Sequence, residues 1–530
     1  MACAGTLHLG APCAVGRLSR RHQAAGPQRH VVVAAAQRSS VTGRAASVEV
    51  EAPSRPAERA ERAKEAQTFD HKAPGDPWQD EPWATMKWTV YRGVAYDLTD
   101  YLANSKHPGG SWLLRLAIGR DCTALFESYH LRPDVAAAHL ARLPKIEDFP
   151  IHTVPVAPYP NDSDLYNSIR ERVRNELFDG AADGRHRTGS EGAAAVILGY
   201  AAVAYAAYAA APNVLTGGLL GLAGAWIGLT IQHCGNHGAM SKSPLVNNLM
   251  GLTDDLIGGS SLMWRYHHQV SHHIHCNDDA LDEDVFSALP FLRFDPRLPR
   301  EWFHKYQHIY MWATFPFLQL VFQIGDWQAL FTNRTKGATL YGVSALERAT
   351  VVAGKLAHYG LIFGLPWVMH GPMQTLVASA CYTAVQGIVL AATFAVSHNL
   401  EENKPVQGGS ASTENLYQPV DSRDWAEQQV LTSSNWGGVV GNFFTGGLNL
   451  QIEHHLFPAI SFMHYPAIAK IVREECEARG INYVHYDTLP EIIGRFSNYM
   501  RDVGSYDMPA TFASLTPGEV ESRRAALARL

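Results

Sequence analysis

Two long stretches of the chain contain no charged residue. No Asp, Glu, Lys or Arg occurs from Ala193 to Ile231 or from Gly371 to Ser397. Because an apolar helix needs about 20 residues to cross a bilayer core, the first stretch fits two membrane spans and the second fits one. A weaker span is expected near Lys355, whose side chain would reach toward the membrane surface. The predicted spans are 193–211, 214–231, 351–369 and 374–397.

The positions of lysine and arginine predict how these spans are oriented. Basic residues flank both pairs of spans, whereas the turns inside the pairs, 212–213 and 370–372, contain none. By the positive-inside tendency, both hairpins open toward one compartment. The stretch 308–323 mixes aromatic with polar residues and is expected to lie in the membrane interface. The segments expected to share one compartment are 1–190, 240–345 and 400–530.

The overall composition excludes some classes of protein. At 530 residues the chain is too long for a single compact core, so two or more domains are expected. The net charge is −6 and no basic block occurs beyond the extreme N-terminus, which argues against a nucleic-acid partner. The seven cysteines are scattered without paired spacing, so a disulfide framework is not expected and a reducing compartment fits better.

The first 48 residues differ in composition from the rest of the chain. They contain six arginines, no lysine and no acidic residue, and the first acid is Glu49. An Arg-rich, acid-poor segment is typical of an organelle transit peptide, and the lack of a clear amphipathic period favours a plastid over a mitochondrion. The alternative is a disordered basic tail. Residues 49–77 alternate charge with Ala and Pro and are expected to form a solvated linker.

A small segment rich in aromatic residues follows, from Trp78 to His152. His107 begins the sequence His-Pro-Gly-Gly, whose glycines form a tight turn without side chains that would block a flat macrocycle. A second histidine, His130, follows 23 residues later, across two expected short helices, and can approach a metal from the opposite face. Together with the ordered elements YDLTDYL (96–102), GRD (119–121) and FESYH (126–130), the segment resembles the cytochrome b5 family.

This resemblance implies that His107 and His130 are the two axial ligands of a haem b. A haem with both axial positions filled leaves no site for oxygen, so it would transfer electrons rather than activate a substrate. The alternative is that His107 merely begins a Gly-rich turn.

Further histidines recur at short spacings near the ends of the predicted spans. Seven histidines lie between residues 231 and 275, and His233 and His237 have the i,i+4 spacing that places two side chains on one helix face. Imidazole is a good ligand for iron, copper and zinc, and ionisable residues at a membrane boundary are generally functional. Eight histidines on one side of the membrane exceed one tetrahedral site and favour two metals: His233, His237, His268, His272, His273, His398, His454 and His455.

This set of motifs resembles the membrane histidine-box desaturases, whose metal centre holds two non-haem irons. The three boxes would be His233–His237, His268–His273 and Gln451–His455. Gln451 stands in place of the first histidine of the last box, which resembles the front-end subfamily, whose members commonly carry an N-terminal haem domain. The resemblance spans residues 160–500 and implies that the iron ligands are the eight histidines above and Gln451. His398 stands alone at the end of the fourth span, and a surface or capping role is its alternative.

Other polar residues near the boxes are not expected to bind metal. His304 and His308 repeat the i,i+4 spacing without a neighbouring box, and His267 and His275 flank the second box as supporting or exposed residues. An acidic stretch after that box is expected to form a solvated loop, with ligand support as the alternative; it contains Asp278, Asp279, Asp282, Glu283 and Asp284.

The resemblance also implies an activity. The chain would be an oxidoreductase that dehydrogenates an acyl chain of a membrane lipid with O2 and two electrons, which the fused haem domain supplies one at a time. A reductase or ferredoxin would reduce the haem. With its transit segment, the chain most resembles the chloroplast front-end desaturases of green algae, which insert a double bond near the carboxyl end, at the Δ4 position, of galactolipid-bound 16-carbon chains. A chloroplast membrane is therefore expected, with the endoplasmic reticulum membrane as the alternative.

Two other functions remain open from the sequence. A sphingolipid or fatty acid desaturase or hydroxylase of the endomembranes would join the same two types of domain, and a membrane-anchored haem electron carrier would need only the haem iron. The expected fold is mainly α, with a small α+β haem domain before an all-α membrane domain with four transmembrane helices. The expected organisation is a transit peptide (1–48), a linker (49–77), a haem domain (78–153), a desaturase domain (160–500) and a C-terminal tail (501–530).

Overall fold

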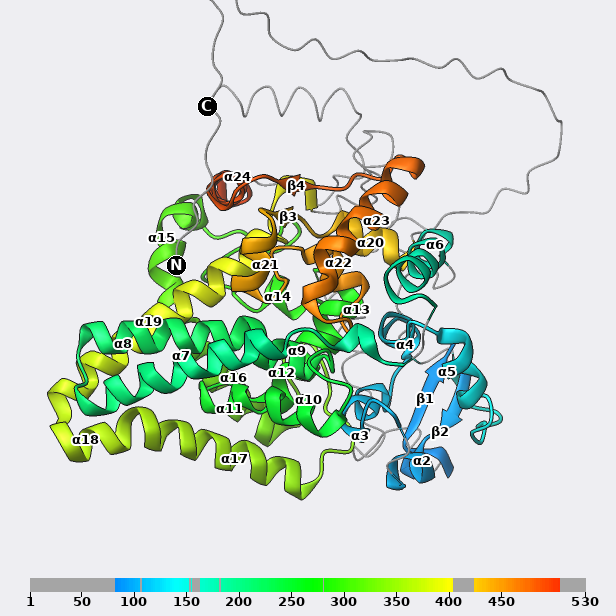
Figure 1. The fold of residues 1–530 in the computed structure, drawn as a ribbon, viewed down its shortest axis with the longest axis horizontal. Helices are drawn as coiled ribbons and strands as arrows, with labels where there is room; N and C mark the ends of the chain where they lie inside the picture. The colour runs from blue at the N-terminus through cyan, green and yellow to red at the C-terminus, as the bar shows by residue number, and fades with distance from the viewer. Residues whose placement is uncertain are drawn as a thin grey trace, which may run out of the picture. The chain divides into compact units, whose positions relative to one another are not determined.

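A computed structural model describes residues 82–104, 107–151, 154, 163–180, 183–279, 281–403 and 424–505. The expected transit peptide and linker lie outside these residues, as does most of the expected C-terminal tail. The predicted fold class is confirmed, since a small N-terminal region containing a β-hairpin precedes a long helical region (Figure 1).

The N-terminal region, residues 82–151, is built on this hairpin. Strands β1 (Trp88–Tyr91) and β2 (Val94–Asp97) pair antiparallel, and the turn residues Arg92 and Gly93 have positive φ angles of 47° and 75°. A turn of this hand matches the twist of the flanking strands. Short helices surround the hairpin: η1 (Pro82–Thr85), α2 (Thr99–Ala103), α3 (Ser111–Leu114), η2 (Arg115–Ala117), α4 (Thr123–Tyr129) and α5 (Pro133–Leu140).

Four helices in the described residues are long and apolar enough to cross a membrane: Arg185–Ala210, Val214–Asn236, Ala345–His370 and Pro372–Val396. Their number agrees with the four membrane helices that the sequence predicts. The first contains η5 (Arg185–Arg187) and α7 (Glu191–Ala210); the second α8 (Val214–Trp226), η6 (Ile227–Gln232) and α9 (His233–Asn236); the third α17 (Ala345–Tyr359), η10 (Gly360–Gly364) and α18 (Leu365–His370); and the fourth is α19 (Pro372–Val396).

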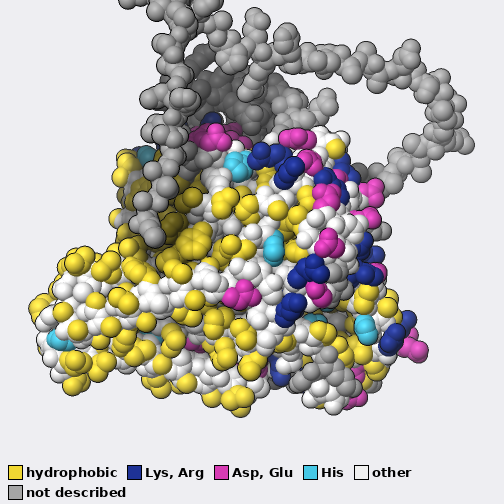
Figure 2. Space-filling model, viewed as in Figure 1, with side chains coloured by type: hydrophobic (Ala, Val, Ile, Leu, Met, Phe, Trp, Pro, Cys, Tyr) yellow, Lys and Arg dark blue, Asp and Glu magenta, His cyan; other side chains and the backbone are white. Residues whose placement is uncertain are grey.

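The surface of these helices is apolar, as a bilayer requires. Large hydrophobic side chains such as Val203, Leu215 and Val368 are exposed, and Figure 2 shows hydrophobic side chains covering the visible face over α7, α8 and α17. The side chain of Asn213 begins α8 by accepting hydrogen bonds from the backbone N–H groups of Leu215 and Thr216.

Helices α8 and α19 lie in close parallel contact. A Cβ added at Gly221 would lie 2.7 Å from the carbonyl oxygen of Tyr382, and one at Gly228 would lie 3.0 Å from the side chain of Leu390. Small residues allow such close approach between helices in a membrane. Because the contacts advance along both helices in the same direction, the C-terminal ends of the second and fourth spans lie at the same end of the helix pair.

Shorter elements connect and cover the spans. Before the first span lie α6 (Asp164–Arg172) and η4 (Val173–Leu177). Between the second and third spans lie α10 (Pro244–Gly251), α11 (Thr253–Leu256), α12 (Ser261–Trp264), η7 (Arg265–His272), α13 (His273–His275), α14 (Glu283–Phe286), η8 (His304–Tyr306), α15 (Gln307–Thr314), η9 (Phe315–Phe317) and α16 (Leu318–Thr332). After the fourth span lie η11 (Glu401–Asn403), α20 (Trp425–Leu431), α21 (Val439–Thr445), α22 (Gln451–Leu456), η13 (Phe462–His464), α23 (Tyr465–Arg479) and α24 (Leu489–Ser505).

Two details differ from the sequence expectation. A two-residue parallel pair, β3 (Asn435–Trp436) with β4 (His485–Tyr486), adds a strand contact to the region expected to be all-α. Helix α24 ends at Ser505, so it reaches into the segment expected to be a tail.

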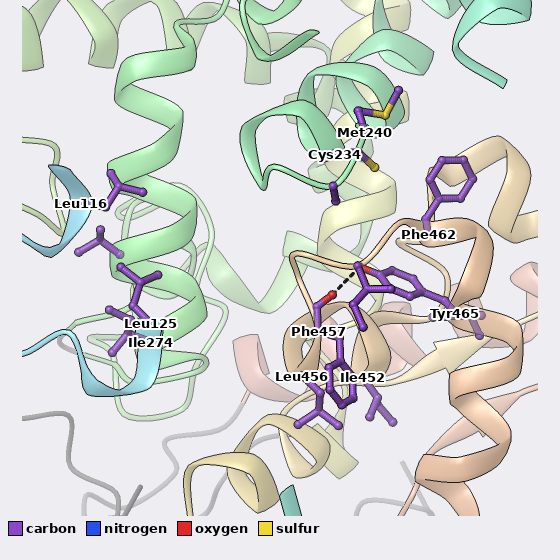
Figure 3. Packing of buried hydrophobic residues seen from close by; sticks show 14 of the residues in the cluster. Leu116, Leu125, Cys234, Met240, Ile274, Ile452, Leu456, Phe457, Phe462 and Tyr465 are labelled. Carbon is purple, nitrogen blue, oxygen red and sulfur yellow. Dashed lines mark hydrogen bonds between the residues drawn. The ribbon is translucent and has the colours of Figure 1, made fainter. Parts of the chain in front are cut away.

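One buried apolar cluster joins the N-terminal region to the helical region. Leu116 and Leu125 belong to the same cluster as Ile274, Ile452 and Phe457. Figure 3 shows Leu125 beside Ile274, which lies on α13 among the histidine-rich elements. The N-terminal region is therefore packed against the part of the chain that carries the boxes.

Lys355 does not reach toward the membrane surface as expected. It is 1% exposed, and its Nζ lies 2.5 Å from Oδ2 of Asp326 on α16 and 2.8 Å from the carbonyl oxygen of Gly258. The local sequence predicted an ammonium group at the membrane surface. It could not show the pairing, because Asp326 lies far from Lys355 along the chain.

Lys355→Met is expected to destabilise the fold strongly, because it leaves the buried Asp326 carboxylate without its partner. Breaking a buried ion pair in this way costs about 3–5 kcal/mol. Thermal unfolding in detergent would measure the change, and Lys470→Met at an exposed position of α23 is the control. A double change, Lys355→Met with Asp326→Leu, is expected to recover most of the loss; no recovery would show that the ion pair is not the cause.

Candidate functional site

His107 and His130 face each other in the N-terminal region. Their ring centres are 6.2 Å apart and their planes stand at 90°. This separation admits one metal bound by a nitrogen of each ring, at roughly 2 Å per bond. Nδ1 of His130 donates to the carbonyl oxygen of Phe126 at 2.8 Å, and Nδ1 of His107 to that of Gly110 at 3.3 Å. Because a carbonyl only accepts, each Nε2 keeps its lone pair for a metal.

The turn after His107 requires glycine, as the sequence predicts. Gly110 has a φ of 94°, and a Cβ added at Gly109 would lie 3.0 Å from the ring of His107. Burial lowers the pKa of His107 and lowers that of His130 to about 4, because burial disfavours the charged imidazolium. Both rings are therefore neutral near pH 7, which is the form that binds metal. The pair fits a haem held from both faces.

The eight histidines predicted to bind metal come from four parts of the chain and meet where the second and fourth spans end. His233 begins α9, and His237 follows directly after it. His268 and His272 lie on η7 and His273 begins α13, while His454 and His455 lie on α22. His398 follows the last turn of α19. All eight side chains are buried, and the parallel packing of α8 and α19 explains why His233 and His398 belong to one site.

Four of these histidines form a group of the size that holds one metal ion. The ligand nitrogens of His233, His237, His268 and His454 lie within 4.8 Å of one another. His273 adjoins this group, because its Nε2 lies 3.1 Å from Nε2 of His268 and 3.0 Å from Nε2 of His454.

A second group of the same size lies beside the first. It consists of His272, Cys276, His398 and His455, again within 4.8 Å. The ring of His455 stacks on that of His273 with centres 4.4 Å apart, so the two groups are neighbours. The side-chain amide nitrogen of Gln451 lies 2.8 Å from Nε2 of His398. The fold thus brings together all nine residues that were predicted from the sequence to be metal ligands.

Hydrogen bonds to the Nδ1 atoms orient several of these rings. Partners of this kind fix the tautomer of a metal-binding histidine and leave Nε2 for the metal. The pairs are His237 with Tyr129 (2.6 Å), His272 with Asp282 (3.1 Å), His398 with the carbonyl oxygen of Thr432 (3.0 Å), His454 with Tyr465 (3.4 Å) and His455 with Gln429 (2.7 Å). Tyr465 donates in turn to the carbonyl oxygen of Phe457, as Figure 3 shows.

The inner atoms of the site are suited to metal ions. Nε2 of His237, Nε2 of His455 and Oε1 of Gln451 are buried and have no hydrogen-bond partner in the described residues. Buried polar atoms are normally satisfied, and unsatisfied ones point to a bound ion or water. The donor set of imidazole nitrogens is one that iron accepts.

Burial keeps most of these rings neutral. It lowers the pKa of His268, His273, His454 and His455 well below the usual value, and neighbouring histidines lower it further, because a second positive charge would be repelled. For His272, burial also lowers the pKa, but the carboxylates of Asp282 and Asp284 outweigh it and the pKa is raised. The neutral rings have the lone pairs that a metal needs.

The acidic stretch after the second box is not the solvated loop that was expected. Asp278, Asp282 and Glu283 are buried. Asp282 contacts Nδ1 of His272, and the side chain of Asp284 lies 2.6 Å from Nε2 of His267. The pattern of charges predicted exposure because partners on neighbouring elements are not visible in a local sequence window. These contacts with His272 and His267 favour the alternative, in which the stretch supports candidate ligands.

The histidines expected not to bind metal lie outside both metal-sized groups in the part of the chain that the structure describes. His304 is buried, accepts from the backbone N–H of Glu301 through Nδ1, and contacts the carbonyl oxygen of Pro290 through Nε2. His267 pairs with Asp284, which supports the neighbouring box as expected. The i,i+4 spacing of His304 and His308 therefore serves no metal-sized group there.

Several residues that contact the boxes were not predicted from the sequence. Trp264 stacks on His268 with ring centres 4.3 Å apart, and Cys276 lies with its Sγ 3.5 Å from Nδ1 of His398. Tyr129 and Gln429 support box histidines from distant parts of the chain. Trp264 and Cys276 could have been suspected because they lie close to a box in the sequence. Nothing in the local sequence around Tyr129 or Gln429 indicates a contact with the boxes.

A cavity of about 500 Å³ lies next to the histidines. Trp264 contributes to its wall and also contacts His233 and His268, so one side chain separates the cavity from the first group. Apolar residues such as Leu390 and Phe394 line part of the cavity, and Arg334 and Lys336 also line it. A mainly apolar cavity of this size with a few polar groups is typical of a small-molecule site.

Comparison with known proteins finds two family matches. Residues 192–487 match the fatty acid desaturase family, and residues 83–149 match the cytochrome b5-like haem/steroid binding domain. The chain is 66% identical to a chloroplastic acyl-lipid (7-3)-desaturase of Chlamydomonas reinhardtii over 93% of each chain. It is 34% identical to an acyl-lipid (7-3)-desaturase of Rebecca salina over 76% of this chain and 87% of that protein. It is 32% identical to an acyl-lipid (8-3)-desaturase of Physcomitrium patens over 79% of this chain and 88% of that protein.

Proposed function

Since the chain belongs to the fatty acid desaturase family and carries a cytochrome b5 domain, we propose that it is a front-end acyl-lipid desaturase of a plastid membrane. It inserts a double bond between an existing double bond and the carboxyl end of a lipid-bound acyl chain. The observation that carries this proposal is that seven buried histidines fall into two adjacent metal-sized groups, with His273 and Gln451 in contact with them, beside a mainly apolar cavity.

The nine side chains would hold two iron ions. His233, His237, His268 and His454, with the adjoining His273, would hold one ion, and His272, His398 and His455, with the adjoining Gln451, would hold the other. When bound, the irons supply the activation of O2 that removes two hydrogens from adjacent methylenes. The protein contributes neutral rings, fixed tautomers and a site from which water is excluded.

His107 and His130 would hold the haem b that delivers electrons. Their Nε2 atoms have lone pairs, and both axial positions would be occupied, so the haem domain transfers electrons and does not bind O2. A reductase or ferredoxin supplies these electrons from outside the chain. Fusion of the domain keeps the electron donor at a fixed place relative to the desaturase.

The cavity next to Trp264 would hold the acyl chain. Leu390, Phe394 and Val321 provide apolar wall, and Arg334 and Lys336 provide cations that suit a polar head group. The relatives from Chlamydomonas reinhardtii and Rebecca salina are both named acyl-lipid (7-3)-desaturases. With the transit segment, these names support a lipid-bound acyl chain of a plastid membrane as the substrate. The substrate that we propose is a galactolipid-bound 16-carbon chain, desaturated at the Δ4 position.

The test is to express the full chain in a plastid-containing host and to map double bonds in each lipid class by mass spectrometry. We expect a new double bond on the carboxyl side of an existing one in plastid lipids. Products confined to sphingolipids, or hydroxylated products, would contradict the proposal. A chain that binds haem iron alone and forms no product would be an electron carrier.

Removal of residues 1–48 tests the plastid location. We expect the shortened chain to be mislocalised while the purified enzyme keeps its activity, because an Arg-rich, acid-poor segment serves import. Fractionation and activity of the purified protein are the measurements. Loss of activity in the purified shortened form would show that the segment has a structural role.

Gln451→His is expected to retain iron while product yield or double-bond position changes. The imidazole restores a nitrogen ligand where an amide now lies 2.8 Å from Nε2 of His398, so the metal is held with altered properties. Iron per chain, corrected for haem, and product analysis are the measurements. Gln451→Leu, which has no ligand atom, is the control and is expected to lose iron; equal iron in Gln451→Leu and the native chain would exclude Gln451 as a ligand.

A further inference from the structure

Tyr129 joins the two domains at a point where each presents a cofactor ligand. It is the last residue of α4 in the haem domain and directly precedes His130. Its hydroxyl oxygen lies 2.6 Å from Nδ1 of His237 and 2.9 Å from Oε1 of Gln269, both in the desaturase domain. Tyr129 therefore contacts one candidate iron ligand and is covalently joined to a candidate haem ligand.

The hydrogen atoms in this contact can be assigned. The amide nitrogen of Gln269 donates to the carbonyl oxygen of Asn236 at 2.8 Å, so the other end of the amide is an acceptor. Tyr129 must use its single hydrogen to donate to Oε1 of Gln269, because that oxygen cannot donate. The hydroxyl oxygen then accepts from Nδ1–H of His237, which leaves Nε2 of His237 unprotonated and facing the metal group.

Other contacts also hold the haem domain against the rest of the chain. The guanidinium of Arg120 donates to the carbonyl oxygen of Thr339 at 2.8 Å and lies over the ring of Tyr341. The guanidinium of Arg265 lies 4.1 Å from the ring centre of Trp112. Glu127 of the haem domain pairs with the buried Arg170 at 3.1 Å. The contact between Tyr129 and His237 is thus one of several contacts in the interface between the haem domain and the desaturase domain.

We propose that Tyr129 is the positioning residue through which the haem domain is coupled to the metal centre. The inference rests on the proposed desaturase function. From the ring of His130 to the hydroxyl oxygen of Tyr129 the connection is covalent within two adjacent residues, and one hydrogen bond completes it to the ring of His237. The path from haem ligand to iron ligand therefore contains a single non-covalent step.

The electron count of the reaction requires two electrons from the haem domain per turnover, delivered one at a time. Together with the two electrons and two protons that leave the acyl chain as its CH2–CH2 bond becomes a double bond, and with two protons from solvent, they would reduce one O2 to two water molecules.

The test is Tyr129→Phe in the full-length protein loaded with haem and iron. This change keeps the ring and removes the hydroxyl. We expect the haem absorption spectrum, the haem reduction potential and the iron content to stay as in the native chain. Oxidation of the pre-reduced haem on mixing with O2 and substrate lipid is expected to slow about tenfold or more, the scale on which partners of metal ligands act.

Tyr465→Phe is the matched comparison. Its hydroxyl also contacts Nδ1 of a histidine in the first group, His454, but from helix α23 of the desaturase domain itself. If Tyr129 only tuned the metal, the two variants would change iron content and haem oxidation in the same proportion. If Tyr129 couples the domains, only Tyr129→Phe slows haem oxidation at constant iron content.

Two results would overturn the proposal. One is native-rate haem oxidation in Tyr129→Phe, and the other is loss of iron that accounts for all of its lost activity. A chemical reductant that reaches the iron without the haem is expected to restore product formation in Tyr129→Phe. Failure of the desaturase function itself would be recognised separately, because the native chain would then form no double bond.

Discussion

Replacing His455 by alanine is expected to abolish desaturation and to lower non-haem iron per chain. His455 is buried at the junction of the two groups, stacked on His273, and its Nε2 has no other partner in the described residues. Changes to the mere partners of metal ligands cost roughly 10–100-fold in affinity or activity, so loss of a ligand is expected to cost at least about 100-fold. His237→Ala and His272→Ala are expected to behave in the same way.

The control for this prediction is His308→Ala. His308 has the same i,i+4 relation to His304 that His237 has to His233, but it belongs to neither metal-sized group. His304 itself is a less suitable control, because it is buried and hydrogen-bonded to the backbone of Glu301 and Pro290, so its loss would also change local stability. Iron per chain, corrected for haem, and product yield are measured together. Equal iron loss in His308→Ala and His455→Ala would refute the assignment of the boxes.

His130→Ala is expected to remove the b5-type absorption spectrum and to reduce turnover with the native electron donor to background. The change deletes one of two facing imidazoles, so the haem loses an axial ligand. His107→Ala is expected to give the same result. Non-haem iron should stay near its native level, because neither ring belongs to the metal-sized groups.

His139→Ala is the control within the same domain. His139 is an exposed histidine of α5, so its loss is expected to leave the spectrum and turnover unchanged. An unchanged absorption spectrum in His130→Ala or His107→Ala would exclude that residue as a haem ligand.

The sequence alone determined the class of the protein and its ligand-bearing motifs. Two uncharged stretches specified three of the membrane helices and a weaker apolar stretch around Lys355 specified the fourth, because in lipid the backbone must satisfy its own hydrogen bonds. His-Pro-Gly-Gly marked the haem turn, since Gly110 needs a positive φ and Gly109 leaves room for the ring of His107. The histidine spacings are local, so they were readable without knowledge of the fold.

Only the tertiary structure decided which distant groups meet. The parallel packing of α8 and α19 brings His233 and His398 to the same end of the helix pair, and the fold of η7 and α22 places His272 and His455 beside His398, relations that no local spacing contains. The same holds for the pairing of Lys355 with Asp326, which replaces an expected surface lysine. Asp282 and Glu283 after the second box are buried beside His272 and His267, which lie on the neighbouring helix η7. Local patterns report the preferences of single segments, whereas the burial of charge depends on partners that the folded chain brings from far along the sequence.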